Sequence, residues 1–387
     1  MTDERVGGDR VKVQRVEMFV CPMATPNDTS GLQELIDGGR VKPDSLVALV
    51  GKTEGTGFHD DWGRVLADIA LREWTARTLG IAVGEVAERV IFVLSGGCPG
   101  VITPHIVAVT REWEEVADGA PGEDEKRLVV GIAGSEPILP EDVGRMGQMR
   151  KVARAVHGAM ADAGVEDPKD VHLAMVKVPG LTTASIKDAQ SRGQTVVTSD
   201  LTFGPEGAGA FANDAAALGV AMALGEVPES SLSDDVVRRD WDLYSEVAMT
   251  SSGGEKRHGE VVVFANSASS RSSLRIGHAA TKDYIDAEGV RAALRAAGLQ
   301  FEALPSAEEL GRLVHVFAKS VIPGTDEIRG QRITLLDDHD AYQIGKALGG
   351  MLVASVTGRT TNYVSGGERN SHQGPPGGNI VAAVVRT

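Results

Sequence analysis

The chain has 387 residues, 42% of them hydrophobic and 24% charged, so we expect a folded globular protein with room for two or three domains. The formal net charge of -15 argues against nucleic acid and anionic membranes as partners, because both are bound mainly through clustered lysine and arginine. Two cysteines are too few for a disulfide framework. The N-terminal segment has no apolar core of signal-peptide length, and no run of about 18 apolar residues occurs in the sequence, so we expect a cytoplasmic protein.

The first third of the chain alternates between strand-like and helix-like segments. One strand-like run ends in Lys52, and a later one carries Ser95 ahead of two glycines. The segment between them has apolar residues at helical spacing. In chain order we predict a strand at residues 16–21, a helix at 30–39, a strand at 45–52, a helix at 62–79, and strands at 90–97 and 101–109.

The same order of elements recurs twice. In the middle third a strand ends in Lys177 and a later one in Ser251-Ser252-Gly253-Gly254; in the last third the equivalents are Lys319 and Ser365. We predict strands at 127–135, 171–177, 246–254 and 260–267 with helices at 144–163 and 215–226, then strands at 274–281, 313–319, 360–367 and 379–385 with helices at 288–299 and 342–356.

This repetition predicts an α/β fold of three modules related by a pseudo-threefold axis, each a small sheet with outer helices. Repeats of more than a hundred residues are too long for solenoid units. Polar, glycine-containing stretches favour boundaries that give module A (1–118), module B (119–270) and module C (271–387). Extra length at residues 228–240 of module B is predicted to be a surface insertion.

A lysine followed by a Ser-Gly pair in each module indicates one shared site in which a lysine activates a serine. A lysine accepts a proton only when neutral, so its pKa must fall by several units from about 10.4. Burial lowers the pKa of a lysine, and we expect three converging lysines to lower one another's further. The glycines leave backbone N–H groups open to a developing oxyanion. The alternative is structural: charged residues often end strands, and Ser-Gly often forms a turn.

The chain resembles the ring-opening cyclic amide hydrolases, a family that comprises cyanuric acid hydrolases and barbiturases. The resemblance covers nearly the whole chain, and its most specific motif is the last one. The segments that carry it are GKTEGTG (51–57), LSGGCPGVITPH (94–105), ALGVAMALGE (217–226), SSGGE (251–255), RGQRITLLDD (329–338) and SGGERNSHQGPPGG (365–378).

The resemblance implies a hydrolase that holds a cyclic amide on the axis, with covalent chemistry in module B. Ser251 would be the nucleophile and Lys177 its base, with Ser252 as an alternative nucleophile. We prefer Ser251 because Ser252 then aligns with Gly96 and Gly366, whose backbone N–H groups it would match. The outer modules would position the ring through Lys52, Ser95, Gly96, Lys319, Ser365 and Gly366.

The family also implies an arginine from each module against the ring carbonyls. Arg64 matches in module A, but Asn213 and Lys346 stand near the positions expected in modules B and C. Because neither replaces the planar fork of arginine, unequal clamps favour the asymmetric barbiturate ring and a linear ureido acid as product. The alternatives are a cyanuric acid amidohydrolase and a non-catalytic member of the fold that binds a heterocycle.

No organic cofactor is expected. The resemblance implies that backbone carbonyls of one Gly/Pro loop hold a structural divalent cation, Mg²⁺ or Ca²⁺. Zinc is less expected, because the histidines lack metal-ligand spacing. The resemblance also implies a homotetramer. The loop residues concerned are Gln373, Gly374, Pro375 and Gly378.

Overall fold

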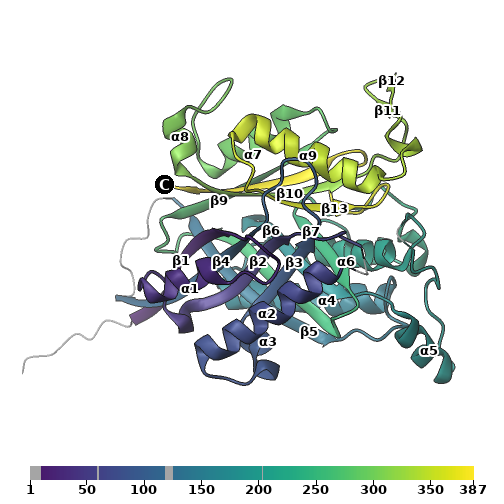
Figure 1. The fold of residues 1–387 in the computed structure, drawn as a ribbon, viewed down its shortest axis with the longest axis horizontal. Coiled ribbons are helices and arrows are strands. Elements are labelled where there is room, and N and C mark those ends of the chain that lie inside the picture. The colour runs from purple at the N-terminus through teal and green to yellow at the C-terminus, as the bar shows by residue number, and fades with distance from the viewer. Residues whose placement is uncertain (1–9, 59–60, 118–124, 203) are drawn as a thin grey trace, which may run out of the picture.

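The computed structural model describes residues 10–58, 61–117, 125–202 and 204–387. Its main strands form three four-stranded sheets, one from each third of the chain, flanked by helices (Figure 1). The predicted α/β fold of three modules is therefore confirmed. The predicted boundary between residues 118 and 119 lies outside the described residues, and both boundaries stay predictions.

The three sheets share one topology. In each, the first strand pairs antiparallel with the fourth, the fourth antiparallel with the second, and the second parallel with the third. The strands are β1 (Arg10–Pro22), β2 (Leu46–Thr53), β3 (Ile91–Gly96) and β4 (His105–Ala117); β5 (Arg127–Pro137), β6 (Val171–Pro179), β7 (Ala248–Gly253) and β8 (His258–Ser267); β9 (Leu274–Thr281), β10 (Leu313–Val321), β13 (Tyr363–Gly367) and β14 (Asn379–Arg386), with a small hairpin of β11 (Glu327–Ile328) and β12 (Gln331–Arg332).

Each parallel pair of strands is joined through a helix, as a parallel crossover requires. The helix at Trp62–Leu79 has the predicted bounds, whereas the one predicted from residue 215 begins at Ala208 and so includes Asn213. Within the described residues, no helix is long and apolar enough to cross a membrane. The helices are α1 (Ser30–Asp37), α2 (Trp62–Leu79), α3 (Val86–Arg89), α4 (Met146–Ala163), α5 (Thr183–Ser191), α6 (Ala208–Leu224), α7 (Ala287–Ala297), α8 (Ala307–Arg312) and α9 (Ala341–Thr357).

The core has a shared centre and separate outer layers. Alternate strand residues point to opposite faces of a sheet, so one face of each sheet packs on its own helices and the other on the neighbouring sheets. The shared centre includes Val50, Met175 and Phe317, one from each module, all 0% exposed. This arrangement brings the ends of the three parallel strand pairs together.

The predicted surface insertion at residues 228–240 is only partly at the surface. Arg238 is 9% exposed, and its guanidinium lies 2.6 Å from the Asp214 carboxylate of α6. It also donates to the backbone carbonyls of Arg369 at 2.7 Å and Asn370 at 2.8 Å. These two bonds join the insertion of module B to module C. The ion pair with Asp214 is expected, because a buried guanidinium is stable only when its charge is paired.

Candidate active site

The three Lys–Ser pairs occupy equivalent positions in the three sheets. In each parallel pair, the lysine near the end of one strand lies opposite the serine of its neighbour. This register makes Ser251, and not Ser252, the structural equivalent of the outer serines. The registers join Lys52 to Ser95, Lys177 to Ser251, and Lys319 to Ser365.

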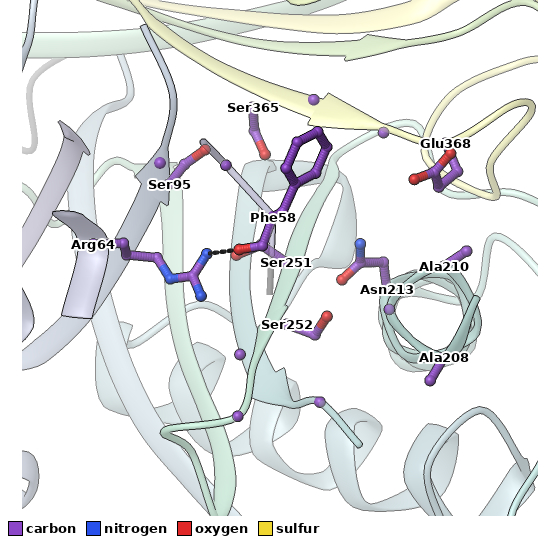
Figure 2. Close-up of a pocket in the computed structure, with 18 of the residues that line it drawn as sticks. Phe58, Arg64, Ser95, Ala208, Ala210, Asn213, Ser251, Ser252, Ser365 and Glu368 are labelled. Atoms are coloured by element: carbon purple, nitrogen blue, oxygen red, sulfur yellow. Dashed lines mark hydrogen bonds between the residues drawn. The ribbon is translucent and has the colours of Figure 1, made fainter. Parts of the chain in front are cut away.

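The serines meet at a cavity of about 100 Å³ that all three modules line (Figure 2). Lys52 and Lys319 do not line the cavity, and their amines donate to Ser95 Oγ at 3.1 Å and Ser365 Oγ at 3.4 Å. Predicted site residues that line the cavity are Arg64, Ser95, Gly96, Lys177, Asn213, Ser251, Ser252, Ser365 and Gly366.

Lys177 is 1% exposed and is the only one of the three strand lysines among the described residues that line the cavity. Its amine donates to the backbone carbonyl of Ser252 at 2.8 Å and lies 3.7 Å from Glu255 Oε1. Ser251 Oγ is buried and has no hydrogen-bond partner among the described residues. The outer lysines thus bind their serine hydroxyls, whereas no hydrogen bond joins the Lys177 amine to the Ser251 hydroxyl in this structure.

Burial lowers the pKa of Lys177 to about 7, with Arg64 and Lys256 contributing to this shift and Glu255 opposing it. Burial likewise lowers the pKa of Lys319 to about 7, with help from the other two strand lysines. Burial is thus the main cause for both lysines. The expected repulsion among the strand lysines contributes to the lowered pKa of Lys319, whereas the cations that act on Lys177 are Arg64 and Lys256. A buried amine with this pKa is substantially neutral near pH 7.

Glu255 is a site residue that the sequence did not single out. Burial would raise its pKa, but Lys177 and Arg64 hold it at about 2, so the carboxylate is ionised. Arg64 Nε lies 3.6 Å from Glu255 Oε1, and Arg64 Nη1 donates to the Phe58 carbonyl at 3.1 Å. Arg64 Nε and Nη2 have no hydrogen-bond partner among the described residues, so this side of the pocket offers donors.

Comparison with known proteins decides the family. A model of the amidohydrolase ring-opening proteins matches residues 17–386. The chain belongs to this family. A cyclic amide hydrolase from Pseudofrankia inefficax is 54% identical over 372 residues, covering 96% of this chain and 95% of that relative. Barbiturase 1 from Nocardioides sp. is 40% identical, covering 97% and 99%. A solved cyanuric acid hydrolase, described as an innovation by structural concatenation, has a TM-score of 0.88 at 40% identity, covering 97% of this chain and 100% of its own.

These likenesses confirm the predicted family and show that this member is a cyclic amide hydrolase. The relatives' names include both cyanuric acid and barbiturate activities, so family membership alone leaves the ring undecided. The names of the relatives assign no role to any single residue, so the role of each predicted site residue has to be judged from the geometry of this chain.

Thr250, which directly precedes Ser251, is held from three sides. Its backbone N–H donates to Gln373 Oε1 at 2.6 Å, and its carbonyl accepts from Lys319 Nζ at 2.9 Å. Its hydroxyl donates to the Asn213 carbonyl on α6 at 2.7 Å. Module C of this ring-opening enzyme therefore fixes the strand that carries the predicted nucleophile.

The arginine-like positions of modules B and C differ from the sequence expectation. Asn213 lines the pocket, and its Oδ1 is buried without a hydrogen-bond partner among the described residues. Lys346 instead donates to the Gly96 carbonyl at 3.1 Å and does not line the pocket. Tyr342, one helical turn earlier on α9, lines it. A Cβ at Gly366 would lie 2.5 Å from the Tyr342 ring, which explains a glycine there.

Two groups of the Gly/Pro loop already take part in hydrogen bonds within the protein. The Pro375 carbonyl accepts from Gly378 N at 2.9 Å, and the Gln373 side chain is committed to Thr250. Within the described residues, no group of three or more His, Cys, Asp and Glu side chains is arranged to hold a metal. A cation bound by backbone carbonyls, including that of Gly374, stays a prediction, and no step below uses it.

Proposed function

We propose that this enzyme opens a six-membered cyclic amide ring by covalent catalysis, with Ser251 as nucleophile and Lys177 as base. One observation carries the proposal: a buried lysine of lowered pKa lies opposite, in the strand register, a pocket serine whose hydroxyl has no hydrogen-bond partner among the described residues. A serine beside a lysine of lowered pKa is a recognised way to activate a hydroxyl.

The reaction follows from these two groups. The neutral Lys177 amine takes the Ser251 hydroxyl proton, and Oγ attacks a ring carbonyl carbon. The ring C–N bond then breaks, and the nitrogen takes the proton back from Lys177. Because the ring stays attached through its other atoms, nothing leaves, and the whole opened molecule is an ester on Ser251. Lys177 then deprotonates a water that attacks the ester carbonyl, and Ser251 Oγ leaves and takes that proton from Lys177, which releases a linear ureido acid.

Arg64 is placed to stabilise charge on a ring carbonyl oxygen. Arg64 is 4% exposed, and its Nε and Nη2 have no hydrogen-bond partner among the described residues. In Figure 2 its guanidinium faces the pocket beside Ser95 and Ser251. A buried, preorganised donor stabilises a developing oxyanion more than an exposed one does.

The preferred ring is barbiturate. A symmetric site would have an equivalent arginine on each of its three walls. Here the three walls carry Arg64, Asn213 and Tyr342, so the walls differ from one another. Barbiturate, with a carbon in place of one ring nitrogen, matches unequal walls. Cyanurate is the second candidate, and the threefold set of pocket serines supports it.

A direct assay decides between them. Loss of ultraviolet absorbance by barbiturate and by cyanurate should be followed with wild type, Ser251→Ala, Lys177→Ala and, as a matched control, Ser252→Ala. We expect barbiturate turnover that only the first two variants abolish. Turnover of neither ring by wild type, or full activity of Ser251→Ala, contradicts the proposal. The homotetramer and the cytoplasmic location stay predictions.

A further inference from the structure

Glu368 brings a buried carboxyl to the pocket. It directly follows β13, is 7% exposed, and lines the cavity. Its Oε1 is buried without a hydrogen-bond partner among the described residues, as is Asn213 Oδ1 nearby. Leaving a buried acceptor unpaired costs about 1–3 kcal/mol, so two of them at one wall indicate a place where a ligand supplies donors.

The opposite wall has the complementary chemistry. In Figure 2 Arg64 and Glu368 lie on opposite sides of the pocket, with Ser251 and Asn213 between them. Arg64 Nε and Nη2 are buried donors without hydrogen-bond partners among the described residues, although Nε lies 3.6 Å from Glu255 Oε1. The pocket therefore offers donors at one end and acceptors at the other.

We propose that Glu368 is a specificity-determining residue that, together with Asn213, accepts a hydrogen bond from a ring N–H of the substrate. The inference rests on the ring-opening function proposed above. In barbiturate and cyanurate alike, an N–H stands across the six-membered ring from a carbonyl. A carbonyl bound by Arg64 thus directs that N–H towards the acceptor wall.

The charges around Glu368 are compatible with this role. Burial and Asp214 raise the pKa of Glu368 to about 7, while Arg238, Lys319 and Arg369 lower it. Both forms of the carboxyl are present near neutral pH, and both offer an acceptor oxygen. If Glu368 served only to balance those cations, it would have no preference for substrates with a free N–H.

N-methylation of the substrate separates the two roles. The kcat and KM of wild type should be measured with barbiturate and with 1,3-dimethylbarbiturate, or with cyanurate and its N-trimethyl derivative if that ring is the substrate. We expect methylation to lower kcat/KM of wild type about tenfold or more, because the acceptors then stay unpaired.

Variants of Glu368 then show whether this residue causes the fall in kcat/KM on methylation. Glu368→Ala should raise KM for the parent ring about tenfold and reduce the fall in kcat/KM that methylation causes. Glu368→Gln keeps an acceptor, so its KM for the parent ring should stay within about fivefold of wild type. Glu302→Ala, which removes an exposed glutamate, is the control. A wild type indifferent to methylation, or an unchanged effect of methylation in Glu368→Ala, overturns the inference while ring opening stands. Should Glu368→Ala fail to fold, the wild-type comparison and Glu368→Gln decide. If no parent ring is turned over, the proposed function itself fails.

Discussion

Replacing Glu255 by glutamine tests whether Lys177 works as a neutral base. The two groups lie 3.7 Å apart, and the carboxylate raises the pKa of the amine. Opposite charges about 4 Å apart interact by about 4 kcal/mol at an effective dielectric constant near 20. At about 1.4 kcal/mol per pKa unit, the loss of Glu255 lowers the pKa of Lys177 by up to about three units. Arg64 shares the carboxylate, so we expect a fall of at least about one unit.

The assay is the pH dependence of kcat/KM for the ring that is turned over. The base acts when deprotonated, so wild-type activity should rise with pH through about 7, the pKa of Lys177. In Glu255→Gln the same rise should occur at lower pH. Glu302→Gln, at an exposed site, should leave the profile unchanged. A Glu255→Gln profile that stays in place or moves to higher pH would refute the reasoning.

Three further changes have defined outcomes. Ser251→Ala should lower kcat at least about a thousandfold, because it removes the nucleophile, and single-turnover kinetics that retain wild-type rates would contradict its role. Gln373→Leu removes the acceptor for Thr250 N–H and should lower kcat more than it raises KM, whereas Gln373→Glu should recover much of the loss; equal effects of both variants on KM alone would argue against positioning. Arg238→Met leaves the buried Asp214 carboxylate unpaired and should lower the free energy of unfolding by about 3–5 kcal/mol, measured by urea denaturation; a loss under about 1 kcal/mol would show that the ion pair is dispensable.

The sequence predicted the repeat and the residue pairs because both depend on local patterns. Strand periodicity and the Ser-Gly turns give the same order of elements three times, and identical order leads to identical strand registers. Lys177 and Ser251 could therefore be predicted as a pair, and the structure places them opposite each other on neighbouring strands.

Contacts between modules could not be predicted in this way. The insertion containing Arg238 is recognisable in the sequence only by its extra length and mostly polar residues, which do not reveal the buried partner of Arg238. Lys346 was placed at the ring by its position on a helix, but its amine is taken up by the Gly96 carbonyl. A one-turn difference along α9 decides which side chain enters the pocket, and periodicity alone does not fix that rotation.

One signal for the acidic residues was present in the sequence. A glutamate follows the glycine pair in two modules, as Glu255 in SSGGE and Glu368 in SGGE. Their different roles depend on their surroundings: cations hold the pKa of Glu255 at about 2, whereas burial raises that of Glu368 to about 7. Only the folded arrangement of charges distinguishes them.

The most direct test of the central claim is to trap the covalent intermediate. Protein mixed with substrate should be quenched in acid within one turnover, digested, and analysed by mass spectrometry with fragmentation. Ring opening without a leaving group predicts that the peptide gains the full mass of the substrate, located on Ser251 and absent in Lys177→Ala. An adduct on Ser95, Ser252 or Ser365, or turnover that produces no adduct under conditions in which hydrolysis of the ester is slow, would contradict it.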